Sequence, residues 1–125
     1  GQFNLVHAIA IDAKSRVVVA DRTNRRLQLF NLEGRYLTEW NDIGTPYGLC
    51  ACVDGSLFVC GLDVDDERFR VVKLDGDGKV LAEFGKTGDE PGDFLMAHSL
   101  YVNANNAVYV ADGKANCVQK FTPID

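Results

Sequence analysis

Short runs of alternating apolar and polar residues recur along the whole chain. The first four runs cover residues 7–12, 16–20, 26–31 and 35–40, with turn residues such as Leu32-Glu-Gly34 between them. Runs of this length suit β-strands and are too short for ordinary helices. The pattern continues over residues 47–53, 56–60, 69–74, 79–84, 97–102, 107–111 and 117–121. The sequence therefore predicts an all-β fold built from short strands.

The sequence also repeats itself at a shift of 91 residues. Ten of the first thirty positions are identical to those 91 residues later, without a gap. His7 falls on His98, and Val17–Asp21 falls on Val108–Asp112. A middle copy fits at a shift of 40, with Tyr47 in the place of His7. The repeat is thus about 40–50 residues long, and four antiparallel strands in that length are typical of one β-propeller blade.

The repeat divides the chain into three predicted blades of one partial propeller, at about residues 1–42, 43–90 and 91–125. The third is expected to lack its outer strand. Three blades are half of a six-bladed ring, and because each blade buries its faces against its neighbours, an open arc leaves two apolar faces in water. We therefore expect either upstream blades of a longer chain or a homodimer that closes the ring with two-fold symmetry.

A motif shared by two copies resembles the NHL repeat of β-propellers. In the first copy it runs from Phe3 through His7 and Val17-Val-Val-Ala-Asp21 to Arg26-Leu-Gln-Leu-Phe30, and the third copy repeats it from Phe94 through Val110-Ala-Asp112 to Phe121. The middle copy departs from it, because Gly61 stands where the first copy has Asp21. The resemblance implies a propeller, and NHL propellers commonly serve as interaction surfaces.

The residues around the two histidines resemble a narrower family. Gly1–Ile9 and Phe94–Leu100 are similar to the last two histidine-bearing blades of the peptidylglycine α-amidating lyases and their bacterial relatives. This resemblance implies a six-bladed propeller that splits peptidyl-α-hydroxyglycine into a peptide amide and glyoxylate. It also implies a zinc ion on the central axis, with His7 and His98 among three histidine ligands, and Met96 lining the substrate pocket. A secreted or periplasmic location follows from the same resemblance.

The rest of that family's site is absent from the sequence. The chain has only two histidines, and the third zinc histidine and the catalytic tyrosine and arginine belong to blades upstream of Gly1. In a closed dimer, Tyr47 of the second copy would lie about 120° around the ring from both His7 and His98, so a phenol would complete the site. We therefore assign no catalytic residue and expect weak or no lyase activity from this chain alone.

A non-catalytic propeller is the alternative function. Propellers host enzymes and interaction scaffolds alike, so the fold does not decide between them. In a scaffold, His7 and His98 would be residues at a repeat position that hydrogen-bond to neighbouring loops. A peptide-like ligand at the channel, lined by Tyr47 and Met96, is compatible with either function.

Charge and hydropathy exclude several partners. The chain has 13 basic and 18 acidic residues, and a net charge of −5 argues against a nucleic-acid-binding surface. A basic recognition loop at residues 21–26 competes with a structural interpretation, in which Asp21 caps the turn or pairs with Arg26. No apolar run approaches the roughly 18 residues that a membrane span needs. We therefore expect neither a nucleic acid nor a membrane as partner.

Two further features have structural as well as functional interpretations. The acidic insertion Asp63-Val-Asp-Asp-Glu67 offers oxygen ligands for calcium, but its spacing lacks the EF-hand pattern and also suits a solvated loop. Among the four cysteines, Cys50 and Cys60 take the places of Ala10 and Ala20 of the first copy. We expect small buried thiols there, because no Cys-x-x-Cys metal or redox pattern is present.

Overall fold

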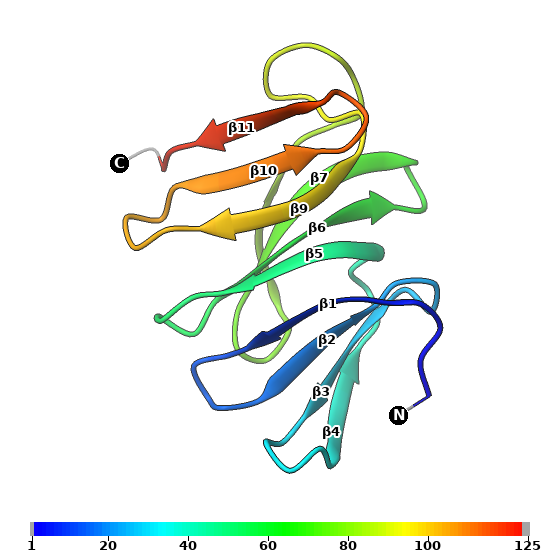
Figure 1. Ribbon diagram of the computed structural model, residues 1–125, viewed down its shortest axis with the longest axis vertical. Helices are drawn as coiled ribbons and strands as arrows, with labels where there is room; N and C mark the ends of the chain where they lie inside the picture. The colour runs from blue at the N-terminus through cyan, green and yellow to red at the C-terminus, as the bar shows by residue number, and fades with distance from the viewer. Residues whose placement is uncertain (1, 124–125) are drawn as a thin grey trace.

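The computed structural model describes residues 2–123, and these form eleven strands in three antiparallel sheets (Figure 1). The strands are β1 (Val6–Ile11), β2 (Val17–Asp21), β3 (Arg26–Phe30), β4 (Tyr36–Trp40), β5 (Thr45–Ala51), β6 (Leu57–Asp63), β7 (Arg68–Leu74), β8 (Val80–Phe84), β9 (Ala97–Val102), β10 (Val108–Asp112) and β11 (Cys117–Phe121). Each strand coincides with a predicted run to within three residues at either end. The prediction of an all-β fold is confirmed.

Every sheet is a meander in which consecutive strands pair. Blade 1 has the order β1-β2-β3-β4, blade 2 the order β5-β6-β7-β8, and blade 3 consists of β9, β10 and β11. The first strands of the blades, β1, β5 and β9, lie side by side, and the remaining strands fan outward from them (Figure 1). This arrangement is that of adjacent propeller blades, and it forms an open arc.

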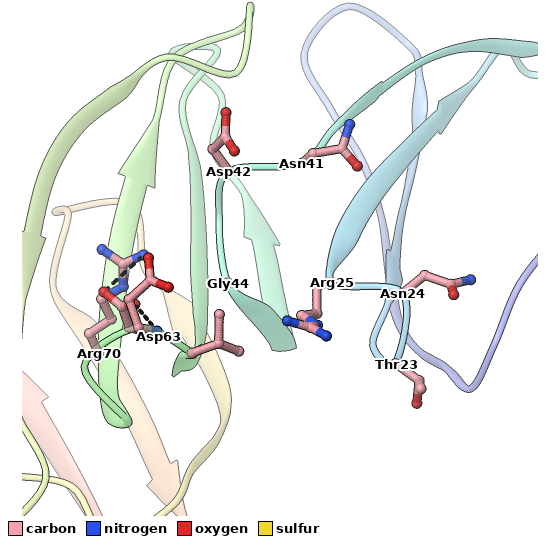
Figure 2. Close-up of a pocket in the computed structure, with 10 residues that line it drawn as sticks. Thr23, Asn24, Arg25, Asn41, Asp42, Gly44, Asp63 and Arg70 are labelled. Atoms are coloured by element: carbon pink, nitrogen blue, oxygen red, sulfur yellow. Dashed lines mark hydrogen bonds and ion pairs between the residues drawn. The ribbon is translucent and has the colours of Figure 1, made fainter.

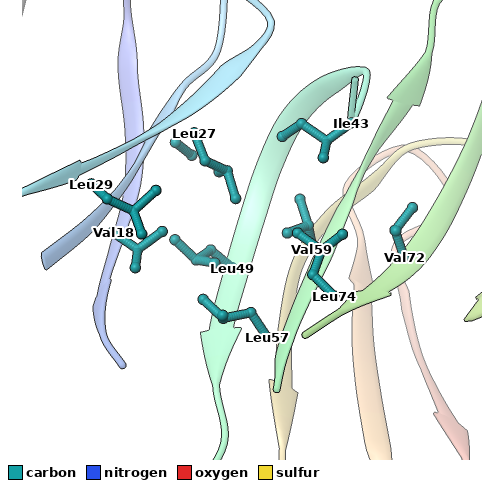
Figure 3. Packing of buried hydrophobic residues seen from close by; sticks show 10 residues of the cluster. Val18, Leu27, Leu29, Ile43, Leu49, Leu57, Val59, Val72 and Leu74 are labelled. Carbon is teal, nitrogen blue, oxygen red and sulfur yellow. The ribbon is translucent and has the colours of Figure 1, made fainter. Parts of the chain in front are cut away.

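Blades 1 and 2 are held together by aliphatic side chains. Because side chains alternate across a strand, one face of blade 1 presents its apolar residues to the facing surface of blade 2 (Figure 3). The buried cluster consists of Val18, Ala20, Leu27, Leu29, Ile43, Leu49, Leu57, Val59, Val72 and Leu74. Each fully buried aliphatic side chain contributes about 1.5–3 kcal/mol to folding, so this interface accounts for much of the stability.

Blades 2 and 3 enclose a second core that contains aromatic rings and thiols. Phe94 is fully buried there, and Phe84 and Phe121 meet with ring centres 4.8 Å apart. Cys60 is buried in this core, as its alanine-equivalent position predicted, whereas Cys50 was predicted to be buried and is half-buried against it. A Cβ on Gly48 would lie 2.9 Å from the Cα of Ser99 on blade 3, so the blades approach too closely here for larger side chains. All four cysteines are free thiols.

The hairpin between β7 and β8 closes over the indole of Trp40. Gly78 adopts a φ of +85° in this turn, and a Cβ on it would lie 2.5 Å from the Trp40 ring. Glycine is therefore needed at this turn both for its backbone conformation and for its contact with the ring.

The two outward faces of the arc carry exposed apolar side chains. On blade 1, Ile9 is 67% exposed and Ile11 is 62% exposed, and on blade 3 Tyr101 and Val118 are similarly open. These are the unpaired faces that an arc of three blades was expected to leave.

No helix within residues 2–123 is long and apolar enough to cross a membrane.

Candidate functional site

Three aromatic side chains from three blades meet at the centre of the arc. The ring centres of His7 and His98 lie 4.8 Å apart, and Tyr47 lies 5.6 Å from His7 and 5.4 Å from His98. They occupy the same repeat position on β1, β5 and β9, and the structure brings them together as that position predicted. We call His7, Tyr47 and His98 the channel cluster.

A β-bulge places each member of the channel cluster. His7 lies between the pairs Val6↔Asp21 and Ala8↔Ala20 and has no partner of its own on β2. The register of β5 against β6 shifts in the same way at Tyr47, and that of β9 against β10 at His98. A bulge inserts one extra residue and re-aims its side chain, so all three rings turn toward the neighbouring first strands.

The hydrogen bond of His7 fixes which of its nitrogens is free. Its Nδ1 lies 2.7 Å from the backbone carbonyl oxygen of Tyr47. Because a carbonyl only accepts, Nδ1 carries the proton, and Nε2 of the neutral ring keeps its lone pair. His7 is therefore oriented as a metal-ligating histidine usually is, with a carbonyl behind it.

His98 is biased toward its neutral form. Burial lowers its pKa, and the positive charge of Arg22, together with that of His7 when His7 is protonated, lowers it further. At pH 7 its imidazole is therefore uncharged and has a nitrogen lone pair available to a ligand.

Arg22 is a site residue that the sequence interpretation missed. Its guanidinium carbon lies 4.2 Å from the ring centre of Tyr47, and its Nη2 donates a 2.9 Å hydrogen bond to the Tyr47 hydroxyl. The sequence does mark Arg22 as a difference between the repeats, because Gly113 occupies the equivalent position in the third repeat. Arg22 adds a fixed positive charge to the channel cluster.

Met96 packs beside His98, where the family resemblance placed a pocket methionine. A Cβ on Gly113 would lie 3.8 Å from the Met96 sulfur and 3.7 Å from the His98 Cβ. Met96 and His98 are both half-buried. Gly113 thus lies against both side chains at the edge of the channel cluster, at distances where a Cβ would make ordinary contact.

Buried carboxylates hold the segments that lead into β1 and β9. Asp21 accepts the N–H of Asn4 at 2.8 Å, and Asp112 accepts those of Leu95 at 2.8 Å and Met96 at 3.0 Å. Burial by itself would raise the pKa of Asp112, but the N–H groups pointing at it outweigh burial and lower that pKa. The carboxylate of Asp112 therefore positions Met96 and, two residues later, His98.

The first repeat carries the expected ion pair as well. Arg26 Nε lies 2.9 Å from Asp21 Oδ2, which confirms the structural interpretation of this segment. In blade 2, where Gly61 replaces the aspartate, β5 and β6 continue pairing through Pro46↔Gly61 and Thr45↔Leu62. A Cβ on Gly61 would overlap the carbonyl oxygen of Thr45, so a closer strand contact takes the place of the carboxylate.

The donor set of the channel cluster fits two ligand positions of a zinc ion. Two imidazoles bound to one tetrahedral zinc at about 2.1 Å have ring centres about 5 Å apart, and those of His7 and His98 are 4.8 Å apart. Within residues 2–123, no three His, Cys, Asp or Glu side chains lie close enough together to hold a metal ion.

Arginines pair with two acidic residues of the insertion, Asp63 and Asp66. Arg70 Nη2 lies 3.7 Å from Asp63, and Arg68 Nε lies 3.4 Å from Asp66. These contacts match the solvated-loop interpretation of the insertion, and calcium binding there remains an expectation from sequence.

Comparison with known proteins identifies the repeat. Residues 94–121 match the family model of the NHL repeat. NHL repeat-containing protein 3 of Homo sapiens is 33% identical over 130 residues, which cover 99% of this chain and 37% of that protein. Peptidyl-glycine alpha-amidating monooxygenase A of Xenopus laevis is 28% identical over 135 residues, covering 98% of this chain and 14% of that protein. The chain thus spans well under half the length of these relatives.

The fold agrees with solved propellers. The WD40 β-propeller domain of Doa1 superposes with a TM-score of 0.69 over 98% of this chain and 39% of that one, at 15% identity. At that identity the likeness concerns the fold alone. The NHL motif, the meander sheets and the arc of first strands agree with one another: the chain is a segment of an NHL-repeat β-propeller.

Proposed function

We propose that this segment supplies the histidine-bearing part of a zinc-dependent lyase site of the amidating type. His7 and His98 would be two of its metal ligands, and Met96 and Tyr47 would line its substrate pocket. The 4.8 Å separation of the two imidazoles carries the proposal, because it suits two ligands of one ion. The similarity to an amidating monooxygenase supports it.

The state of each histidine supports the same proposal. His7 offers its Nε2 because its Nδ1 is engaged by the Tyr47 carbonyl, and His98 is neutral because its pKa is lowered by burial and nearby charge. When bound, zinc would serve as a Lewis acid on the substrate hydroxyl. In the lyase reaction the carbon–nitrogen bond of peptidyl-α-hydroxyglycine breaks, the hydroxyl proton leaves, and the amide nitrogen gains a proton.

Arg22 would orient the substrate in this site. Its guanidinium is held against the Tyr47 ring, so its remaining N–H groups have a fixed direction. The glycine end of an α-hydroxyglycine peptide carries a carboxylate, and arginine binds carboxylates in a planar, two-point geometry. Arg22 would therefore hold that carboxylate beside the imidazoles.

Ring closure by a second copy is the proposed route to a third ligand, which would be the partner's Tyr47. The support comes from the repeat: Tyr101 and Val118 on the outward face of blade 3 are equivalent to Ala10 and Leu27, which pack blade 1 on blade 2. The same face would meet Ile9 of a second copy. Sedimentation at micromolar concentration should give a dimer mass, and a monomer would contradict closure by a second copy.

An interaction scaffold that binds an anionic ligand is the second candidate. It is favoured by Arg22, whose fixed positive charge beside His98 opposes a bound cation and attracts a carboxylate. In this case the channel cluster would bind the acidic end of a peptide without metal or reaction.

Glyoxylate release from an α-hydroxyglycine peptide distinguishes the two candidates. For the lyase, we expect a slow, zinc-dependent rate that chelation abolishes and that His7→Ala and His98→Ala each remove. For the scaffold, we expect peptide binding that is unchanged by chelator and lost in Arg22→Gln. A fast rate from the chain alone would contradict our expectation that catalytic groups from other blades are required.

A further inference from the structure

A polar cavity of about 590 Å³ lies between blades 1 and 2. Figure 2 shows Asn24 and Arg25 of the β2–β3 loop on one side, Asp63 and Arg70 on the other, and the linker from β4 to β5 between them. We infer that this cavity is a subsite for the upstream part of a peptide whose end lies at the channel cluster, and that Arg25 meets one acidic side chain of that peptide. The inference rests on the proposed peptide binding at the channel cluster.

The β2–β3 loop connects the cavity to the channel cluster. The N–H of Arg25 donates to the carbonyl oxygen of Arg22 at 3.1 Å, which closes a turn with Arg25 at a positive φ of 55°. This turn sends the two arginines in different directions: Arg22 to the Tyr47 ring and Arg25 into the cavity. One short loop therefore supplies a cation to each of the two places.

Strand β5 sets the distance between the cavity and the channel cluster. Gly44 lines the cavity and Tyr47 belongs to the channel cluster, three residues further along the chain. At about 3.3 Å per extended residue this separation is about 10 Å. A peptide lying along the same direction would cross it with three residues.

Gly44 lets the wall of the cavity pack against the backbone of β6. It has a φ of +77°, and a Cβ on it would lie 2.5 Å from the backbone oxygen of Leu62. Ile43 beside it is buried in the core between the blades, which fixes the linker in place. The wall is therefore backbone anchored by a buried side chain, an arrangement suited to an extended ligand.

Arg25 is the arginine of the cavity that can pair with one acidic group of a ligand. Arg70 is engaged by Asp63 and Glu83, whereas Arg25 forms no ion pair with any acidic residue among residues 2–123. Asp42 and Asp65 also line the cavity, so with two arginines and three aspartates it does not attract a polyanion. Arg25 offers one unshared cation, and one carboxylate complements it.

The test measures binding of two fluorescein-labelled pentapeptides that end in glycine and differ at one position. One carries Asp and the other Asn at the third residue before that glycine, and fluorescence anisotropy gives their affinities for the 125-residue chain. We expect about two- to fivefold tighter binding of the Asp peptide, the range of an exposed charge pair. Arg25→Gln should abolish this preference and leave the affinity for the Asn peptide unchanged.

Arg35→Gln is the matched control, because Arg35 is an exposed arginine next to β4 that does not line the cavity. It should retain the preference. Equal binding of the two peptides by the wild-type chain, no binding of either, or an undiminished preference in Arg25→Gln would each overturn the inference. Repeating the measurement with chelator present separates the two proposals, since a preference that persists while no zinc is bound leaves the subsite standing even where glyoxylate release fails.

Discussion

Asp112→Asn should destabilise the protein and displace the segment that carries Met96 and His98. The carboxylate of Asp112 is 4% exposed and accepts four backbone N–H groups. They belong to Leu95, Met96, Lys114 and Ala115, at 2.8, 3.0, 3.0 and 2.9 Å. Asparagine keeps one acceptor oxygen and replaces the other, which accepts from Leu95, with an NH₂ group that cannot accept.

The magnitude follows from the number of bonds lost. One hydrogen bond to a charged group contributes about 1.5–3 kcal/mol, so Asp112→Asn should lower the free energy of unfolding by about that amount. Asp112→Ala removes both acceptor oxygens and all four hydrogen bonds, and we expect about 4–6 kcal/mol, since part of the loss is recovered when loop N–H groups reach water.

Urea unfolding followed by tryptophan fluorescence measures both variants. Asp77→Asn is the control, because its side chain is 88% exposed and pairs only at 3.6 Å with Lys14, so its effect should stay within about 0.5 kcal/mol. If Asp112→Asn costs no more than this control, the carboxylate does not hold the segment before β9 and the positioning argument is wrong.

Three further predictions follow from other parts of the molecule. Gly78→Ala should lower the free energy of unfolding, measured in urea, by about 2–4 kcal/mol, because it adds a clash with Trp40 to a positive φ. Gly55 has a similar φ of +95° in open space, so Gly55→Ala should lower it by only about 1–2 kcal/mol. Equal losses in the two variants would contradict the clash with Trp40. Burial, His7 and Arg22 lower the pKa of His98 in the folded protein, so the unfolded chain takes up this proton first as the pH falls below about 6.5. The free energy of unfolding should therefore decrease from pH 7.5 to 5.5, and it should decrease less steeply in His98→Gln. An identical slope in both proteins would refute the lowered pKa of His98. Burial raises the pKa of Cys60 to about 12, so iodoacetamide should label the exposed Cys117 in the native protein and reach Cys60 only after unfolding, as mass spectrometry of the peptides would show.

The repeat made most of the fold predictable. Apolar alternation located the strands, and the 91-residue shift placed His7 and His98 at one position because blades are copies of one unit. Strand ends in blade 2 were less predictable: β6 continues to Asp63, three residues past the predicted end, because Gly61 lets β5 approach closely. Backbone contact of this kind leaves no hydrophobic signature.

The candidate site was predictable only where the repeat marks it. Tyr47 was expected to complete a site in a second copy, whereas within this chain it already contacts both histidines. Arg22 was missed because its role depends on a loop turning toward the neighbouring blade, a relation between segments that periodicity does not record. The cavity near Arg25 escaped prediction for the same reason, since it exists only between two blades.

Metal content is the most direct test of the central claim that His7 and His98 bind one ion. The chain is purified with zinc present, dialysed, and measured by plasma mass spectrometry beside the double variant His7→Ala/His98→Ala. We predict one zinc for each closed ring of two chains in the wild type and none in the variant, at an unchanged circular dichroism spectrum. A wild-type chain without zinc, or a double variant that retains as much zinc as the wild type, would contradict the claim.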